Sequence, residues 1–171
     1  MAKLIDALRA RFADKILAID DRFGDEVVTI GRDDSLAIFG HLRDDPAMAF
    51  DFLMDRTVVD YLGRTPRFDV VSMLASSSLR HRLCVKIGVE EKDPRVPSLT
   101  PLWKSANWLE REAFDMFGIR FDGHPDLRRI LMYDAFEGHP LRKDYPFNRR
   151  QPLVPERDPI ENPWPARKFG A

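Results

Sequence analysis

Hydrophobic residues at helical spacing open the chain. From residue 3 to residue 19 they recur every three or four positions, with basic residues between them, as in Leu4, Ile5, Leu8, Phe12, Ile16 and Ile19. On an α-helix this spacing gathers the apolar side chains on one face. We therefore predict an amphipathic helix over residues 3–19.

Alternating apolar and polar residues predict β-strands further along the chain. The clearest runs are 68–75 and 79–89, separated by a turn at the three serines 76–78. In the second run one face should be buried, because apolar residues occupy every other position: Leu83, Val85, Ile87 and Val89. Shorter runs predict strands at 26–30 and 35–39, joined as a hairpin by the turn 31–34, and a strand at 57–62.

Two further helices are predicted from their start signals. Asp45-Pro46 and Thr100-Pro101 each place a capping side chain before a proline at the first helical position. The first helix should continue to Met54. The second should follow a charged loop at 90–99 and end at Gly118. Its apolar stripe is predicted to be core: Leu102, Trp103, Ala106, Leu109, Ala113, Met116 and Phe117.

The character of the chain changes after about residue 120. Seven of the 13 prolines lie between Pro140 and Pro165, and basic residues alternate there with aromatic ones. Proline opposes regular structure. We therefore predict an α+β fold over residues 1–120, with a small mixed or antiparallel sheet of about four strands packed with helices. A long, extended, Pro- and Arg-rich C-terminal arm over residues 121–171 should follow it.

Composition narrows the possible functions. The 171 residues are 44% hydrophobic, enough for one domain with a core, and the net charge of −1 gives no general reason to expect nucleic acid or anionic lipid. The sequence contains no apolar run long enough to span a membrane and no hydrophobic signal region near its start. The predicted location is the cytoplasm or a surface facing it.

Residue types needed for independent chemistry are scarce. Cys84 is the single cysteine, and the four histidines have no metal-binding spacing. Glycine-rich phosphate loops and a GxSxG nucleophile motif are both missing from the sequence. We predict no catalytic, cofactor-binding or metal-binding residue in this chain, and we expect Cys84 to be a small buried or half-buried strand residue.

The acidic end of the last predicted helix, Glu110-Arg111-Glu112, suggests paired carboxylates. However, helix positions two residues apart point about 200° away from each other, so Glu110 and Glu112 should face opposite ways. Arg111 and Asp115 have the spacing of an ion pair. One interpretation is a solvated helix end with local ion pairs. In the other, Glu110, Arg111 and Asp115 hold the following segment or a partner.

His124 and His139 each lie in a Gly-His-Pro turn that leads into a basic strip. Turns that present basic side chains are favoured over a two-histidine metal site, which remains the basis of a weaker hypothesis, a small metal-dependent enzyme. The basic pairs at 128–129, 142–143 and 149–150 could bind nucleic acid or form salt bridges with acidic groups of a protein partner. The net charge of the chain is nearly zero, which favours a protein partner over nucleic acid. Arginine and aromatic residues are also enriched in interfaces, so the arm indicates a subunit that wraps a partner.

These same residues resemble a known family. The run from Glu110 to Pro146 contains the motifs Glu110-Arg111-Glu112-x-x-Asp115-Met116-Phe117-Gly118, Gly123-His124-Pro125-Asp126-Leu127-Arg128-Arg129 and Gly138-His139-Pro140-Leu141-Arg142-Lys143-Asp144-Tyr145-Pro146. It is similar to the 30-kDa subunit (the C subunit in bacteria) of respiratory complex I, the proton-translocating NADH:quinone oxidoreductase. The resemblance implies a peripheral-arm subunit of that translocase, without catalytic residues of its own.

The resemblance also implies cofactors and partners. FMN, iron–sulfur clusters and quinone would belong to the parent complex, and none to this chain. The chain would be an obligate hetero-oligomer, packed chiefly on the 49-kDa (D) subunit near the quinone-reaction region, at the cytoplasmic face of the bacterial inner membrane, with no nucleic acid. The partner-docking residues would be Glu110, Arg111, Glu112, Asp115, His124, Arg128, Arg129, His139, Arg142, Lys143 and Tyr145. The alternatives are the equivalent subunit of a membrane-bound hydrogenase or ferredoxin:quinone complex, and a basic-arm nucleic-acid-binding module.

Overall fold

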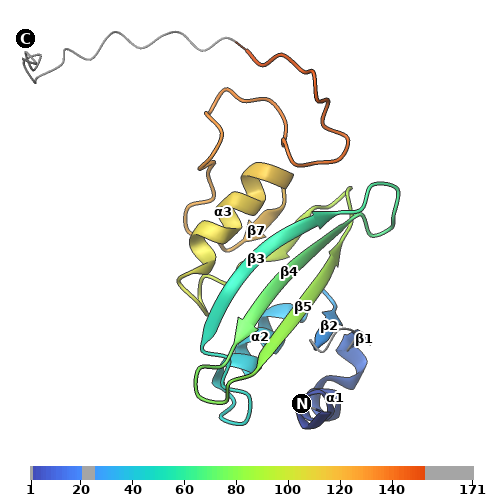
Figure 1. Cartoon of the computed structure of the whole chain (residues 1–171), viewed down its shortest axis with the longest axis vertical. Coiled ribbons are helices and arrows are strands. Elements are labelled where there is room, and N and C mark those ends of the chain that lie inside the picture. Colours follow the sequence, from blue (N-terminus) through green and yellow to red (C-terminus); the bar gives the residue numbers. More distant parts are fainter. Residues whose placement is uncertain (1, 21–25, 153–171) are drawn as a thin grey trace, which may run out of the picture.

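A mixed β-sheet with helices packed on one side forms the body of the protein (Figure 1). The computed structural model describes residues 2–20 and 26–152, and residues 153–171 of the predicted arm lie outside the described part. In chain order the elements are α1 (Ala2–Phe12), the 3-10 helix η1 (Ala13–Lys15), β1 (Ile16–Asp20), β2 (Val27–Ile30), α2 (Ser35–Asp44), β3 (Phe52–Asp60), β4 (Phe68–Ala75), β5 (Arg82–Val89), β6 (Arg95–Pro97), α3 (Ala106–Phe117) and β7 (Arg120–Asp122).

Five strands form the main sheet, in the order β1-β2-β5-β4-β3. All neighbours pair antiparallel except β2 and β5, which pair parallel. Strands β6 and β7 form a separate parallel pair. This arrangement confirms the predicted α+β class and the mixed sheet, with one more strand in the main sheet than expected.

The hydrophobic core lies between this sheet and helices α2 and α3. Alternate residues of β4 are buried, and their side chains meet buried residues from β5 and from both helices. Cys84 is buried on β5, as predicted. Most of the expected stripe of α3 is also buried. The main contributors to this core are Phe68, Val70, Leu74, Val85, Ile87, Ile38, Phe39, Leu42, Ala106, Ala113 and Met116.

Two of the predicted elements have the wrong type. Residues 35–39 belong to helix α2 instead of a strand, because Ile38, Phe39 and Leu42 have helical spacing and fill the core together. The helix predicted from Asp45 is also wrong. Asp45 ends α2 instead, and its carboxylate accepts a hydrogen bond from the Ala47 N–H in a local turn. The apolar residues after it form the extended strand β3.

Several boundaries also differ from the sequence prediction. The first helix ends at Phe12, and Ile16 and Ile19 reach the core from strand β1. Pro101 lies in a turn, and α3 begins only at Ala106. The predicted loop 90–99 contains β6, which ends at Pro97. Residues 68–75 form β4 as predicted. Gly118 ends α3 in the left-handed conformation, with φ of 76°. Among the helices in the described part of the chain, none combines the length and apolar character needed to cross a bilayer.

Candidate partner-docking site

Residues 123–152, which we call the strap, carry most of the motif. The strap leaves β7 without regular secondary structure and passes over the end of α3 and of the main sheet (Figure 1). Since such a segment makes few hydrogen bonds of its own, its path depends on contacts with the domain. Two groups of buried charges provide those contacts.

Asp115 is the first anchor of the strap. Its carboxylate is fully buried on α3, and Oδ2 accepts hydrogen bonds from the backbone N–H groups of Ile130, Leu131 and Met132 at 3.1, 2.8 and 2.9 Å. Oδ1 pairs with Arg129 at 2.9 Å. Burial acts to raise the pKa of Asp115, but these donors together hold it below its ordinary value. The ionised carboxylate therefore stabilises this part of the strap.

Arg111 holds the strap just before that point. Its guanidinium donates to the backbone carbonyls of Arg128 and Arg129 at 3.1 and 3.4 Å, and Trp108 stacks against it with the ring centre 4.9 Å away. The predicted pairing of Arg111 with Asp115 is wrong, because each side chain binds the strap separately. Of the three residues expected to hold the following segment or a partner, Arg111 and Asp115 do contact the following segment.

Arg67, which directly precedes β4, forms the second anchor of the strap. Its nearly buried guanidinium pairs with both oxygens of Asp60 at 2.8 Å and with Asp144 of the strap at 2.6 Å, and it reaches Glu91 at 2.5 Å. Asp60 also accepts the backbone N–H of Lys143 at 2.8 Å. Hydrogen bonds from Arg67 lower the pKa of Asp60, so this carboxylate also stays ionised.

Between the two anchors, the strap caps the C-terminal end of α3. The last carbonyls of a helix lack partners within it. Three strap groups donate to them: His139 Nδ1 to Asp115 at 2.9 Å, the Leu141 N–H to Met116 at 3.2 Å, and Arg142 Nε to Phe117 at 2.6 Å. Gly118 leaves the space for this contact, since a Cβ there would lie 2.5 Å from His139 Nε2.

The strap loop also packs against itself. Phe136 stacks on Tyr145 with ring centres 6.0 Å apart and meets Tyr133 edge-on, while Arg129 lies over its ring. Gln151 binds Tyr145 and the backbone of Glu137. The motif residue Tyr145 thus belongs to a small aromatic cluster on the strap.

Glu110 has a different role from the one predicted. It is fully buried and accepts hydrogen bonds from Ser98 Oγ and the Leu99 N–H at 2.6 and 2.7 Å, so it holds the preceding loop and does not touch the strap. The interpretation of this segment as a solvated helix end is therefore wrong, because Glu110, Arg111 and Asp115 are all buried. Glu112 is exposed on the other side of the helix, which confirms the expected divergence of the two glutamates.

His124 and His139 contact α3 at separate points. His124 Nε2 donates to the carbonyl of Asn107 at 3.1 Å, eight residues before the carbonyl that His139 binds. Eight helical residues span about 12 Å, so the two rings are not brought together. Within the described ranges, no group of three or more metal-ligating side chains is present.

Four residues of the site were missed by the sequence analysis. Asp60 and Arg67 flank the β3–β4 turn, Trp108 stacks on Arg111, and Asp144 lies inside the quoted motif without having been selected. Charged residues at strand ends ordinarily face solvent. Nothing in the sequence separates Asp60 and Arg67 from such residues.

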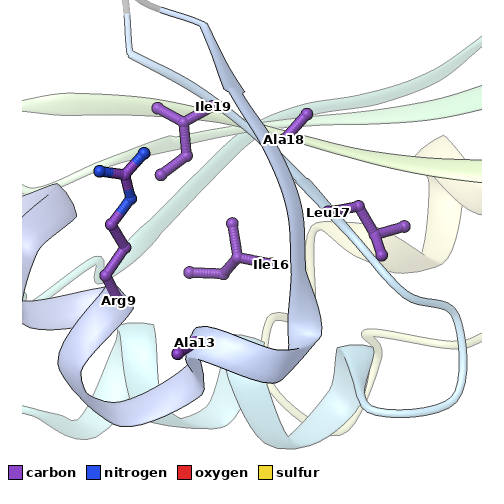
Figure 2. A pocket seen from close by; sticks show the side chains of 6 residues that line it. All are labelled: Arg9, Ala13, Ile16, Leu17, Ala18 and Ile19. Atoms are coloured by element: carbon purple, nitrogen blue, oxygen red, sulfur yellow. The ribbon is translucent and has the colours of Figure 1, made fainter.

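A small pocket between α1 and β1 lies away from the strap. Its lining is mainly apolar, with Arg9 as its one ionisable side chain, and consists of Arg9, Ala13, Ile16, Leu17, Ala18 and Ile19 (Figure 2). A lone arginine offers no partner for acid–base or nucleophilic chemistry. The strap and its anchors therefore remain the candidate site.

Comparison with known proteins identifies the same family that the sequence motif resembles. The family model described as respiratory-chain NADH dehydrogenase, 30 Kd subunit, matches residues 28–151. The C subunit of NADH-quinone oxidoreductase from Roseiflexus sp. (strain RS-1) is 50% identical over 150 residues, covering 88% of this chain and 86% of the relative.

Two solved structures are also similar. Nqo5, solved as a trypsin-resistant fragment (1–134), has a TM-score of 0.65 at 38% identity, over 74% of this chain and 98% of that one. A chain of the archaeal membrane-bound sulfane sulfur reductase has a TM-score of 0.71 over 86% of each chain. Because the two sequences are only 18% identical, this similarity shows a shared fold and nothing about function. With the family model covering most of the strap and the sheet, the chain belongs to the 30-kDa subunit family of respiratory-chain NADH dehydrogenase.

Proposed function

We propose that this chain is a non-catalytic peripheral-arm subunit of a proton-translocating NADH:quinone oxidoreductase. Its strap would dock chiefly on the 49-kDa (D) subunit, near the quinone-reaction region and at the cytoplasmic face of the bacterial inner membrane. FMN, iron–sulfur clusters and quinone would be held by other subunits. Family membership supports this proposal, as do the names of the relatives.

The observation that carries the proposal is the anchored strap with exposed side chains along it. Buried carboxylates fix its path at two places, so its outer side chains have defined positions. Several are large and apolar: Leu131, Tyr133, Leu141 and Phe147, with Trp108 of α3 beside Arg111 and 65% exposed. Tryptophan, tyrosine and arginine are enriched among the residues that dominate binding energy in interfaces.

The motif residues then divide into two groups. Arg111, Asp115, Arg129, His139 and Arg142 shape the strap from inside, as their hydrogen bonds to α3 or the strap indicate. Exposed motif residues such as Glu112, Arg128 and Lys143 would contact the partner directly. The division of the chain into a domain at 1–120 and a docking arm at 121–171 is part of the same proposal.

Gentle isolation of the tagged chain from its native host tests this function. We expect the 49-kDa subunit, iron–sulfur subunits and an NADH-binding subunit to co-purify. Trp108→Ala and Lys143→Glu should each lower recovery of the 49-kDa subunit at least tenfold, while Lys92→Glu, an exposed lysine on the β5–β6 loop, should not. A stoichiometric flavin or cluster in the isolated chain, or recovery without any respiratory subunit, would contradict the proposal.

Limited proteolysis gives a second test. We expect the segment after about residue 120 to be cut in the isolated chain and protected in the assembly. Equal resistance in the two states would argue against docking of the strap on a partner.

A further inference from the structure

The turn between β3 and β4, residues 61–66, lies directly beside the second anchor of the strap. Asp60 and Arg67 flank this turn, and they also hold the strap. Asp60 accepts the N–H of Lys143 at 2.8 Å, and Arg67 pairs with Asp144 at 2.6 Å. In Figure 1 the turn projects from the end of the sheet that the strap crosses. The second anchor therefore joins two segments that are 77 to 83 residues apart in the sequence.

Large apolar side chains are exposed on both of these segments. Tyr61 and Leu62 of the turn are 40% and 56% exposed, Leu141 of the strap is 52% exposed, and Phe147 is fully exposed. Single exposed apolar residues are ordinary on a protein surface, whereas several gathered at one place mark an interaction site. All four residues here lie within three positions of a residue of the second anchor.

Contacts within the turn hold it in one conformation before any partner binds. The Arg64 N–H donates to the Tyr61 carbonyl at 2.9 Å, and the Arg64 guanidinium lies 3.9 Å from the centre of the Tyr61 ring. The same guanidinium donates to the Pro66 carbonyl at 2.9 Å and pairs with Asp69. The Pro66 ring rests against Gly88 of β5, where a Cβ would lie 2.6 Å from it. A segment that is already ordered loses little conformational entropy on docking.

One interface is wide enough to cover the turn and the strap together. Two residues of extended chain span at most about 7 Å. Leu62 is two positions from Asp60 and Leu141 is two positions from Lys143, so the contact between Asp60 and Lys143 keeps both leucines within about 25 Å of each other. One side of a standard interface is about 800 Å², or about 30 Å across. A partner seated on the strap near residue 143 therefore also reaches the turn.

The charges at this place favour a protein over an anionic lipid surface. Segments that bind such lipids collect about four to eight basic residues. Among the basic side chains of the turn and of strap residues 141–150, Lys143 and Arg150 alone form no ion pair or hydrogen bond within the described ranges. Acidic partners within the chain already neutralise others: Arg64 with Asp69, and Arg149 with Glu137. An apolar protein surface with a few carboxylates at its edge complements this arrangement.

We propose that the β3–β4 turn is part of the docking surface for the subunit that receives the strap. Tyr61 and Leu62 pack on an apolar surface of that subunit, and carboxylates at its edge meet Lys143 and Arg150. This inference rests on the proposed function, because its occupant is the 49-kDa subunit named there. It adds a segment that lies outside the motif run 110–146. The strap can dock whether or not the turn takes part, so the two proposals fail separately.

A charge introduced at Leu62 tests the inference. Leu62→Glu would bury a carboxylate against an apolar surface and near the partner's own carboxylates, so it should lower recovery of the 49-kDa subunit with the tagged chain about tenfold. Leu79→Glu is the matched control and should leave recovery unchanged, because Leu79 is an exposed leucine in the β4–β5 turn, at the opposite end of β4. Thermal unfolding should show that both variants fold.

Three results of this experiment would overturn the inference. Full recovery of the 49-kDa subunit with a folded Leu62→Glu chain would do so and leave the proposed function standing. Equal losses in Leu62→Glu and Leu79→Glu would do the same, because the turn would then matter no more than a distant surface. If the unmodified chain brings down no respiratory subunit, the proposed function falls and this inference falls with it.

Hydroxyl-radical footprinting checks the contact without a mutation and identifies other occupants. Tyr61 and Leu62 should be modified at least fivefold more slowly in the assembly than in the isolated chain, and equal rates would contradict the inference. A dimer of the isolated chain that Leu62→Glu dissociates, seen by light scattering, would make the occupant a second copy. Flotation with vesicles of phosphatidylcholine and phosphatidylserine that Leu62→Glu abolishes would make it a lipid surface. Either result would overturn the inference.

Discussion

Arg56 of β3 and Glu110 of α3 form an ion pair in which neither side chain has any exposed surface, with Nε and Oε1 3.4 Å apart. The pair joins the sheet to the helix that carries the strap anchors. Arg56 also donates to the carbonyl of Pro97 at 3.1 Å, and its guanidinium lies 5.8 and 5.2 Å from the ring centres of Phe39 and Phe121. Burial lowers the pKa of Arg56 to about 10, against the attraction of Glu110, so it remains charged at neutral pH.

Removing one member of this pair should destabilise the whole domain. Arg56→Met leaves the Glu110 carboxylate buried without its cation, and breaking a buried pair in this way costs about 3–5 kcal/mol. Chemical denaturation should show a loss of that size. Glu112→Gln, at an exposed position of the same helix, should change the free energy of unfolding by less than about 0.5 kcal/mol. Equal effects of the two substitutions would contradict the role given to the pair.

Arg56 also shows where sequence patterns stop being informative. The alternation in β4 and β5 predicted both strands because almost every inward position is apolar. In β3 the inward residues include Arg56 and Asp60, and a bulge near Met54 shifts the alternation. The pattern therefore predicted a helix as far as Met54 and a strand only from residue 57. These charged residues can face inward because each pairs with an opposite charge elsewhere in the fold. A single sequence does not show which distant residues pair.

The sequence predicted that the strap would be irregular, but it did not predict where the strap would lie on the domain. The proline and arginine content predicted an irregular arm, and the motif predicted that this arm binds a protein partner. The contacts of Asp115 with the N–H groups of Ile130 to Met132 depend on backbone groups, which every residue carries. Helical spacing could suggest only the local partner Arg111, while the fold brings in groups 14 to 17 residues away.

Asp115→Asn should loosen the first anchor of the strap. The amide keeps the volume of the side chain but loses the charge that binds Arg129 and three N–H groups, and hydrogen bonds to a charged group are worth about 1.5–3 kcal/mol each. We expect a loss of about 2–3 kcal/mol and at least tenfold faster hydrogen exchange at residues 130–132. Asp134→Asn, on an exposed part of the strap, is the matched control and should alter neither.

Alanine substitutions at Gly118 and Gly123 should distinguish the effect of backbone strain from that of a close contact. Both have positive φ, 76° and 84°, so alanine should cost about 1 kcal/mol at either position. Only at Gly118 would the new Cβ meet His139 and Arg142, at 2.5 and 2.7 Å. Gly118→Ala should therefore be about 1–3 kcal/mol more destabilising than Gly123→Ala, and thermal unfolding should show it. Equal losses would mean that the strap does not pack against Gly118.

The environment of His139 favours its neutral form. Burial lowers the pKa of its imidazole below the usual value, the hydrogen bond to the Asp115 carbonyl opposes this, and Arg142 and Arg129 add to the lowering. Since Nδ1 donates to a carbonyl, Nδ1 carries the proton of the neutral ring. Protonation would place a second positive charge beside Arg142 at the end of α3.

This contact should make the strap sensitive to mild acid. A histidine whose pKa is lowered by folding stabilises the folded state fully above its unfolded value of about 6.5 and loses that contribution as the pH falls further. From pH 7.5 to 5.5 the free energy of unfolding and the protection of strap amides should therefore decrease. His139→Asn can keep the hydrogen bond to Asp115 without titrating, so it should flatten this pH dependence, whereas His124→Asn should preserve it. If the slope persists unchanged in His139→Asn, another group causes it and the neutral-histidine contact is not what holds this part of the strap.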